Sequence, residues 1–198
     1  MTMELVVATR NKKKVEEIRR ILEGLPVTLR SIDDFPGCPE VEEDADTFEG
    51  NAIKKARAVA SYTGKPAIAD DSGLEVNALN GAPGVFSARY AGPDADDERN
   101  REKLLFEMVE IEEGSRGARF VCSVALAFPE GQVETFEGHV EGRIGTGQRG
   151  SCGFGYDPVF YPTDHERTFA EMSAEEKDAL SHRGKALKKL REYFSDHP

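Results

Sequence analysis

The chain has 198 residues, of which 38% are hydrophobic and 32% are charged, and its net charge is −11. This length and composition are typical of a globular protein with a core of its own, and the acidic charge disfavours nucleic acid as a partner. No apolar run is long enough to cross a membrane, and the first residues lack the layout of a signal peptide. Three cysteines without a Cys-x-x-Cys pair are typical of a reducing compartment, so we expect a cytoplasmic protein with no membrane partner.

A strand, a polar turn and a helix open the chain. The apolar run over Glu4–Ala8 predicts the strand. Apolar residues then recur at helical spacing from Val15 to Leu22, before Gly24 and Pro26 end the helix. A second strand is expected over "PVTLRSI", so the chain begins as an α/β unit.

The polar turn, "TRNKKK", is the first candidate binding segment. It stands where a strand passes into a helix, and the free N–H groups and dipole of a helix N-terminus favour a phosphate. We therefore expect Thr9, Asn11 and Lys14 to meet an anion. An ordinary N-cap by Asn11 is the alternative that this stretch leaves open.

An acidic, proline-rich loop, "PGCPEVEEDADTF", leads into a second helix. The pair Asp46–Thr47 is expected to cap this helix, and Gly64 is expected to end it. Within it, Phe48, Asn51 and Lys55 share one face at spacings of three and four. The loop carboxylates suit Mg²⁺, which needs one or two of them besides phosphate oxygens and waters.

A third strand is predicted over "PAIADD", with a turn at Ser72–Gly73 directly after it. Side chains alternate between the faces of a strand, so Asp70 and Asp71 reach one site only if the strand ends there. Open α/β sheets build their sites at such strand ends. We expect one carboxylate to act in a site and the other to hold the turn through its backbone N–H groups.

The rest of the chain predicts a mixed sheet. A turn-rich loop with a short helical piece, "GAPGVFSARYAG", precedes a helix over "DDERNREKLLFEMVEI". Two long strands, "ARFVCSVALAF" and "GQVETFEGHVEGRI", form a predicted hairpin. A glycine-rich loop then enters a last strand, and "SHRGKALKKLREYF" is predicted to be helical. This order indicates an α/β fold with a mixed sheet, and two lobes with a cleft between them fit it.

Two late segments carry groups that suit a purine base. The segment "GFGYDP" offers the rings of Phe154 and Tyr156 and the acceptor Asp157. The segment "SHRG" offers His182 and Arg183 as donors. With the phosphate and metal groups above, these are the parts of a nucleoside triphosphate site.

These motifs resemble the inosine triphosphate pyrophosphatase family, which hydrolyses non-standard purine nucleoside triphosphates. The match covers nearly the whole chain, with "TRNKKK", "TFEGNAIKKA", "ADDSGLEVNALNGAPGVFSARYAG", "GFGYDPVF" and "SHRGKAL" in family order and spacing. The resemblance implies a single domain over residues 1–198, with an elongated mixed β-sheet flanked by helices and an active-site cleft between two lobes. It also implies a Mg²⁺-dependent homodimer that converts ITP, dITP or XTP to the monophosphate and pyrophosphate.

The resemblance also assigns roles to residues by their position in the motifs. Asp71 is the expected base for the attacking water and, with Glu43, the expected metal ligand, whereas Asp70 is expected either to hold the turn or to support the residues that contact the substrate. Lys55 is the second expected catalytic residue, and Phe154 is expected to stack on the base. The other expected substrate-binding residues are Thr9, Arg10, Asn11, Lys12, Lys13, Lys14, Asn51, Ser72, Gly155, Tyr156, Asp157, Lys177, His182 and Arg183.

Two departures and two alternatives remain at this point. Cys152 stands where the family usually has a glycine, which questions the backbone of that loop, and Glu40, Glu42 or Asp44 is an alternative metal ligand to Glu43. A pyrophosphatase for modified pyrimidine triphosphates is one alternative function, although the aromatic and donor groups favour a purine. A nucleotide-binding module without hydrolysis is the other, although extra carboxylates would not help it bind a polyanion.

Overall fold

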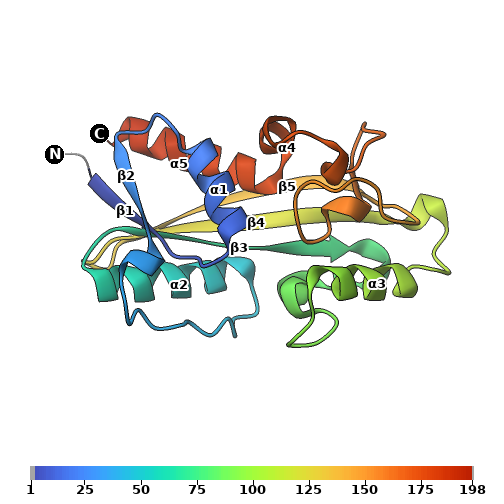
Figure 1. Ribbon diagram of the computed structural model, residues 1–198, viewed down its shortest axis with the longest axis horizontal. Coiled ribbons are helices and arrows are strands. Elements are labelled where there is room, and N and C mark those ends of the chain that lie inside the picture. Colours follow the sequence, from blue (N-terminus) through green and yellow to red (C-terminus); the bar gives the residue numbers. More distant parts are fainter. Residues whose placement is uncertain (1–2, 198) are drawn as a thin grey trace. The chain divides into compact units, whose positions relative to one another are not determined.

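A computed structural model describes residues 3–197 of the chain, which form a six-stranded mixed sheet with helices on its faces (Figure 1). The strands are β1 (Met3–Val7), β2 (Val27–Ser31), β3 (Ala67–Val76), β4 (Gly117–Ala127), β5 (Val133–Ile144) and β6 (Phe160–Pro162). The α-helices are α1 (Lys12–Ile21), α2 (Phe48–Thr63), α3 (Asp97–Glu107), α4 (Ala174–Leu180) and α5 (His182–Asp196).

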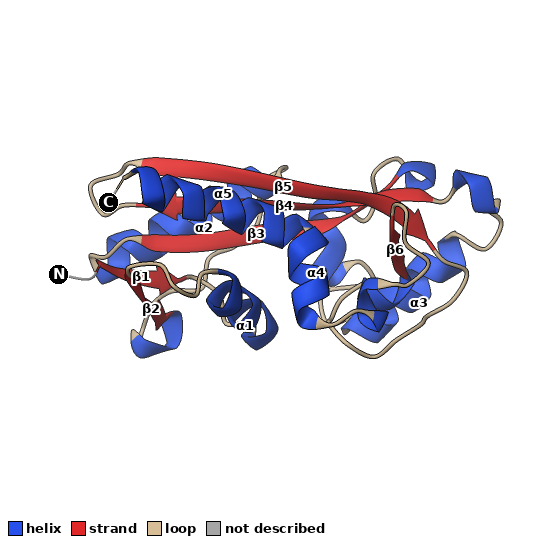
Figure 2. Cartoon of the chain, turned by 90° about the horizontal axis from the view of Figure 1, so that it is seen from above, coloured by secondary structure: helices blue, strands red, loops and turns tan. Residues whose placement is uncertain are grey.

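The strands follow the order β2-β1-β3-β4-β5-β6 across the sheet. Strand β1 pairs in parallel with both β2 and β3, whereas β5 and β6 are antiparallel. Figure 2 shows β4 and β5, the two longest strands with 11 and 12 residues, side by side. The predicted α/β class with a mixed sheet flanked by helices is therefore confirmed. Between residues 3 and 197, no helix is both long enough and apolar enough to cross a membrane.

The chain divides into two compact units. Strands β3, β4 and β5 each contribute residues to both units. Unit 1 consists of Met1–Asp71, Cys122–Gly138 and Arg183–Pro198, and unit 2 consists of Ser72–Val121 and His139–His182.

The core of unit 1 follows the alternation of side chains along its strands. Leu5 and Ile68 face α1 and α5, whereas Val6, Ala67 and Ala69 face α2. Figure 1 shows α1 and α5 on one side of these strands and α2 on the other. The face toward α2 is built largely from methyl groups, contributed by Ala8, Ala52, Ala56, Ala60, Ala67, Ala69, Ala125 and Ala127.

The core of unit 2 is aromatic, and one buried arginine supports it. Phe160 lies 4.6 Å from Phe120 and 5.3 Å from Phe169, measured between ring centroids. The Arg116 guanidinium donates to four backbone carbonyls, one of them that of Met108 at 2.6 Å, directly after α3. A planar group with five donors suits this task, because several carbonyls are satisfied at once.

Strand β3 is longer than predicted. The predicted end at Asp71 and the turn at Ser72–Gly73 are wrong, because β3 continues to Val76. The reason is burial: Leu74 and Val76 are fully buried in the core of unit 2. Strand pairing toward that core overrides the turn preference of a single Ser-Gly pair.

Most other predicted elements are confirmed. Strand β1 lies one residue earlier than predicted, and Thr47 and Gly64 bound α2 as expected. Helix α4 was not predicted, although its signal is present in the sequence. Ser173 Oγ accepts from the Glu176 N–H at 3.2 Å and Glu176 Oε2 accepts from the Ser173 N–H at 2.8 Å, which is a capping box.

Candidate active site

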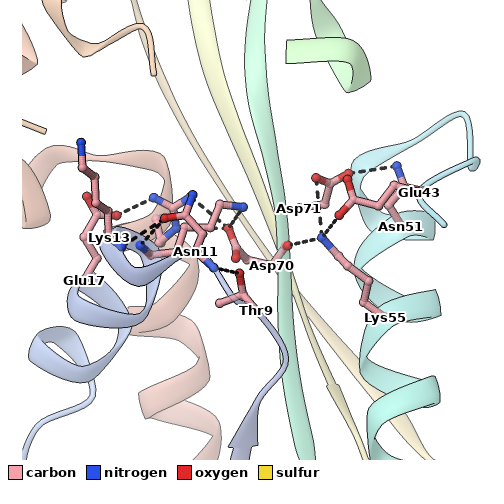
Figure 3. Close-up of polar contacts among 11 residues, drawn as sticks. Thr9, Asn11, Lys13, Glu17, Glu43, Asn51, Lys55, Asp70 and Asp71 are labelled. Carbon is pink, nitrogen blue, oxygen red and sulfur yellow. Dashed lines mark hydrogen bonds and ion pairs between the residues drawn. The ribbon is translucent and has the colours of Figure 1, made fainter. Parts of the chain in front are cut away.

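Asp70 and Asp71 point to opposite faces of β3 (Figure 3). Asp70 follows Ile68 on the face covered by α1 and α5, and Asp71 follows Ala69 on the face covered by α2. Both carboxylates are buried, with 2% and 6% of their residue surface exposed. Of the two roles predicted for Asp70, holding a turn is therefore wrong, because no turn follows it, and supporting the residues that contact the substrate stays a prediction.

Asp70 is the centre of a buried ion cluster. Its Oδ2 accepts from Arg183 Nε at 3.1 Å and Nη2 at 2.9 Å, and Lys14 Nζ lies 3.0 Å from it. Arg183 Nη1 donates in turn to Glu17 Oε2 at 2.5 Å. Burial alone would raise the pKa of Asp70, but the charges of Lys14 and Arg183 hold it well below its usual range. Asp70 is thus ionised, and it joins β3 to α1 and α5.

Asp71 lies in a separate cluster with two residues of α2 and one of the acidic loop. Lys55 Nζ donates to Glu43 Oε1 at 2.6 Å and to the backbone oxygen of Asp70 at 2.7 Å, and lies 3.9 Å from Asp71 Oδ1. Asn51 Nδ2 donates to Asp71 Oδ2 at 3.0 Å. Burial raises the pKa of Asp71; Lys55 lowers it in part, but Glu43 raises it further. Asp71 is therefore a fixed carboxylate that accepts a proton more readily than an exposed one.

Asn51 also fixes the acidic loop. Its Oδ1 accepts from the Ala45 N–H at 2.9 Å, so one buried amide holds both the loop and Asp71. Asn51 thus positions Asp71 and the acidic loop, and its contact with a substrate stays a prediction. Of the loop carboxylates, Glu43 lies with Lys55, whereas Asp44 pairs with Lys54 at 2.5 Å. This arrangement favours Glu43 over Asp44 as the loop carboxylate that would bind a metal together with Asp71.

The first turn of α1 is capped by its own asparagine. Asn11 Oδ1 accepts from the N–H groups of Lys13 at 3.1 Å and Lys14 at 3.3 Å, and its own N–H donates to Thr9 Oγ1 at 3.2 Å. The N-cap interpretation of Asn11 is confirmed. The segment still presents a helix N-terminus with basic residues to an incoming anion.

Two basic residues of this segment serve other contacts or lie in solvent. Arg10 Nη2 donates to the backbone oxygen of Cys38 at 3.1 Å, and its Nε lies 3.8 Å from Asp33. Lys12 is exposed in the first turn of α1. The structure does not bring these two side chains to Asp70.

Unit 2 holds the aromatic cluster expected from "GFGYDP". Asp157 Oδ2 accepts from the Phe154 N–H at 2.9 Å and from Lys177 Nζ at 2.7 Å. Lys177 Nζ lies 4.8 Å from the centroid of the Phe154 ring. Asp157 and Lys177 are buried and Phe154 is half-buried. Asp157 and Lys177 thus hold the Phe154 ring in place at the surface of the unit.

Gly153 is required by this cluster. Its φ is +74°, and a Cβ at this position would lie 2.0 Å from Asp157 Oδ2. Cys152, which precedes Gly153, does not have a positive φ; the residues of this stretch that do are glycines. The N–H of Cys152 donates to the backbone oxygen of Ala170 at 3.0 Å. The cysteine in place of the usual glycine therefore fits the backbone of the loop.

Two of the predicted substrate-binding side chains belong to the core of unit 2. Tyr156 is 4% exposed, and its hydroxyl donates to the Ser87 oxygen at 2.8 Å. His182 is also 4% exposed and stacks on Phe120 at 4.6 Å. Both side chains pack within unit 2, and their contact with a substrate stays a prediction. Ser72 is half-buried on β3.

Three further residues carry little signal in the sequence. Glu17 stands three residues after Lys14, on the same helix face, and this spacing is its only signal. Asp97 and Arg101 in α3 read as exposed helix residues, yet both contact the backbone of Gly155, at 2.8 Å and 2.7 Å.

A family model described as Ham1 family matches residues 5–193. The chain belongs to the Ham1 family. The resemblance stated from the motifs is thereby confirmed. A dITP/XTP pyrophosphatase from Geobacter sulfurreducens is 54% identical over 190 residues, which cover 96% of each chain. A second one, from Desulforamulus reducens, is 53% identical over 193 residues, or 98% of this chain and 96% of that one. The solved structure of a HAM1 protein from Coxiella burnetii matches with a TM-score of 0.90 at 42% identity, covering 98% of this chain and 99% of that one.

Replacing Arg183 by alanine removes the guanidinium that neutralises Asp70 and Glu17. Breaking a buried ion pair destabilises by about 3–5 kcal/mol, so the melting temperature should fall by roughly 10 °C. The control is Lys188→Ala, which removes the same charge from an exposed position of α5 and should shift it by less than about 2 °C. Equal thermal unfolding of the two variants would contradict the structural role of Arg183.

Replacing Gly153 by alanine should also destabilise unit 2. The new methyl group meets the Asp157 carboxylate, and a left-handed φ adds about 1–2 kcal/mol for a residue with a Cβ. We expect the melting temperature to fall by about 3–8 °C. Gly147→Ala is the matched control, because no atom lies within 4 Å of its added Cβ. A loss no larger than that of the control would show that Asp157 moves aside freely.

Proposed function

We propose that the chain is a nucleoside triphosphate pyrophosphatase that converts ITP, dITP and XTP to the monophosphate and pyrophosphate. The observation that carries the proposal is the buried Asp71 beside Lys55 and Glu43, in a chain 54% identical to a dITP/XTP pyrophosphatase. The activity removes non-standard purine nucleotides from the nucleotide pool. The free cysteines Cys38 and Cys122 support a cytoplasmic location, and the family resemblance supports a homodimer.

The triphosphate is assigned to the basic residues of unit 1. Thr9, Asn11 and Lys14 surround the N-terminus of α1, where the helix dipole and the lysine favour negative charge. Lys55 adds a second ammonium beside Asp71. Lys14 and Lys55 are also held by carboxylates, and an incoming phosphate would share both ammonium groups with them.

The base is assigned to the aromatic cluster of unit 2. The Phe154 ring is half-buried and offers one face for stacking on a purine. Hypoxanthine and xanthine carry a carbonyl at position 6, and the Lys177 ammonium beside the ring is a donor that suits it. Adenine presents an amino group there, so a site that depends on this donor disfavours ATP. His182 and Arg183, the donors first expected here, are also buried, and Arg183 donates to Asp70 and Glu17.

The cofactor assigned to the site is Mg²⁺, held by Glu43 and Asp71. The donor set fits: oxygens of both carboxylates converge on one cation, the Lys55 ammonium. Within residues 3–197 no third carboxylate, histidine or cysteine joins them as a ligand group, so phosphate oxygens and water would complete the shell. When bound, Mg²⁺ offsets the negative charge of the phosphates.

Asp71 is the residue assigned to activate the attacking water. Its carboxylate orients a water and takes a proton from it, and the water oxygen attacks the α-phosphorus. The bond from this phosphorus to the bridging oxygen breaks, and pyrophosphate leaves. Lys55 and Lys14 stabilise the negative charge that develops on the phosphates. The raised pKa of Asp71 suits the role of a general base.

Pyrophosphate release tests the proposed function. The protein should release pyrophosphate from ITP and XTP with Mg²⁺ present, and an excess of EDTA should abolish the release. ATP and UTP are the comparison substrates: faster turnover of UTP would favour a pyrimidine pyrophosphatase. Binding of ITP without any release would favour a nucleotide-binding module.

Asp71→Asn tests the role of the carboxylate. Asparagine keeps the shape and can still accept from Asn51, so the melting temperature and ITP binding should stay close to the parent's. Turnover of ITP should fall by on the order of 10²-fold or more, because the base is lost. Asp94→Asn, at an exposed position, is the control and should retain full turnover. Turnover of Asp71→Asn within about threefold of the parent would exclude Asp71 as the base.

A further inference from the structure

Two side chains of helix α3 contact both backbone polar groups of Gly155 in the glycine-rich loop. Asp97 Oδ2 accepts from the N–H of Gly155 at 2.8 Å, and Arg101 Nη1 donates to the carbonyl oxygen of the same residue at 2.7 Å. Asp97 and Arg101 are four residues apart and therefore lie on one face of α3. We call these two contacts on Gly155 the α3 clamp. Because Gly155 directly follows Phe154, the clamp fixes the backbone next to the Phe154 ring.

The same arginine also holds the beginning of the glycine-rich loop. Arg101 Nε donates to Gln148 Oε1 at 2.8 Å, and its Nη2 donates to Glu98 Oε2 at 2.6 Å. Gln148 Nε2 donates to Glu98 Oε1 at 2.7 Å, which closes a ring of three side chains. All three nitrogens of Arg101 are thus used, and only 12% of its side-chain surface is exposed. A planar guanidinium that makes several hydrogen bonds at once loses little side-chain freedom for each hydrogen bond formed.

The backbone on either side of Phe154 needs this support. Gly153 has a φ of +74° and Gly155 a φ of +59°, so the ring stands between two glycines in the left-handed region. Glycine has the largest backbone freedom of any residue. The Asp157 carboxylate holds the Phe154 N–H, and the α3 clamp holds the peptide groups that follow. Together they limit the directions in which the ring can point.

Helix α3 is itself a fixed support. Asn100, 3% exposed, donates to the Ala88 oxygen at 3.1 Å and accepts from the Ala91 N–H at 2.8 Å. At the other end, Arg116 donates to the Met108 oxygen directly after the helix. Because α3 is fixed, the clamp also fixes the part of the loop that it contacts.

We propose that Asp97 and Arg101 are positioning residues for the purine base: they hold Gly155 so that the Phe154 ring keeps the orientation in which it stacks. This inference rests on the proposed function, since it assigns the base to Phe154. Both contacts of the clamp lie within unit 2, whereas Lys14 and Asp71 belong to unit 1. Loss of the clamp should therefore weaken the contribution of the base to binding and leave that of the phosphates unchanged.

The test compares two ligands on matched variants. Asp97→Ala and Arg101→Ala remove the clamp, whereas Glu102→Ala and Arg99→Ala remove the same charges from exposed positions of α3. The probes are ITP, through KM and kcat, and inorganic tripolyphosphate, through its inhibition constant. Loss of one such hydrogen bond should raise KM for ITP about tenfold in the clamp variants. Values of kcat and the inhibition constant should stay within about twofold of the parent's, and Asp97→Asn, which keeps an acceptor oxygen, should restore most of KM.

Two results would overturn the proposal. One is an unchanged KM for ITP in both clamp variants. The other is an equal loss for ITP and tripolyphosphate, which indicates a general structural defect. Turnover of ITP by the parent protein tests the proposed function separately. If the parent does not hydrolyse ITP, amide hydrogen exchange still tests the clamp: Phe154 and Gly155 should exchange faster in Asp97→Ala than in Glu102→Ala, and equal rates would refute it.

Discussion

The alternation of side chains along β3 is the constraint on which unit 1 depends. Two adjacent aspartates necessarily leave the strand on opposite faces, and each meets a different set of helices. One face gives Asp70 the basic residues of α1 and α5; the other gives Asp71 the polar side chains of α2. A pair that looks like a double charge in the sequence is thus two single charges in separate surroundings.

These surroundings shift the pKa values of the two carboxyl groups in opposite directions. Asp70 is surrounded by cations, and its pKa lies below the ordinary value; Asp71 faces a neighbouring glutamate in a buried place, and its pKa lies above it. Two groups of the same type, one residue apart, thereby serve different purposes. The first joins helices to the sheet, and the second is the residue for which we propose proton transfer. The Lys55 ammonium links them, since it reaches the backbone of one and the side chain of the other.

Local patterns predicted much of the fold, and long-range contacts account for most of what they missed. Period and capping residues were sufficient for α1, α2, α5 and the long hairpin. The strand through Ser72 and Gly73 was mispredicted because its continuation depends on a core that the local sequence does not reveal. For the site, Lys14 and Lys55 were proposed from their places in two helices, and Asp71 from the apolar strand before it and from the family resemblance. The partners Arg183 and Asp70 are 113 residues apart, and Arg101 and Gly155 are 54 apart, so no short window of sequence contains them.

The alanine-lined face between α2 and the strands limits how unit 1 can evolve. Methyl groups let the helix approach the sheet closely, and only at that separation can the short amide of Asn51 reach Asp71. A bulkier residue at Ala52 or Ala56 would wedge the helix outward and carry Asn51 and Lys55 away from the carboxylate. Exchange of either alanine for a larger residue should therefore disturb the site without touching it. The larger side chains under α1 and α5 leave more freedom for compensated exchange.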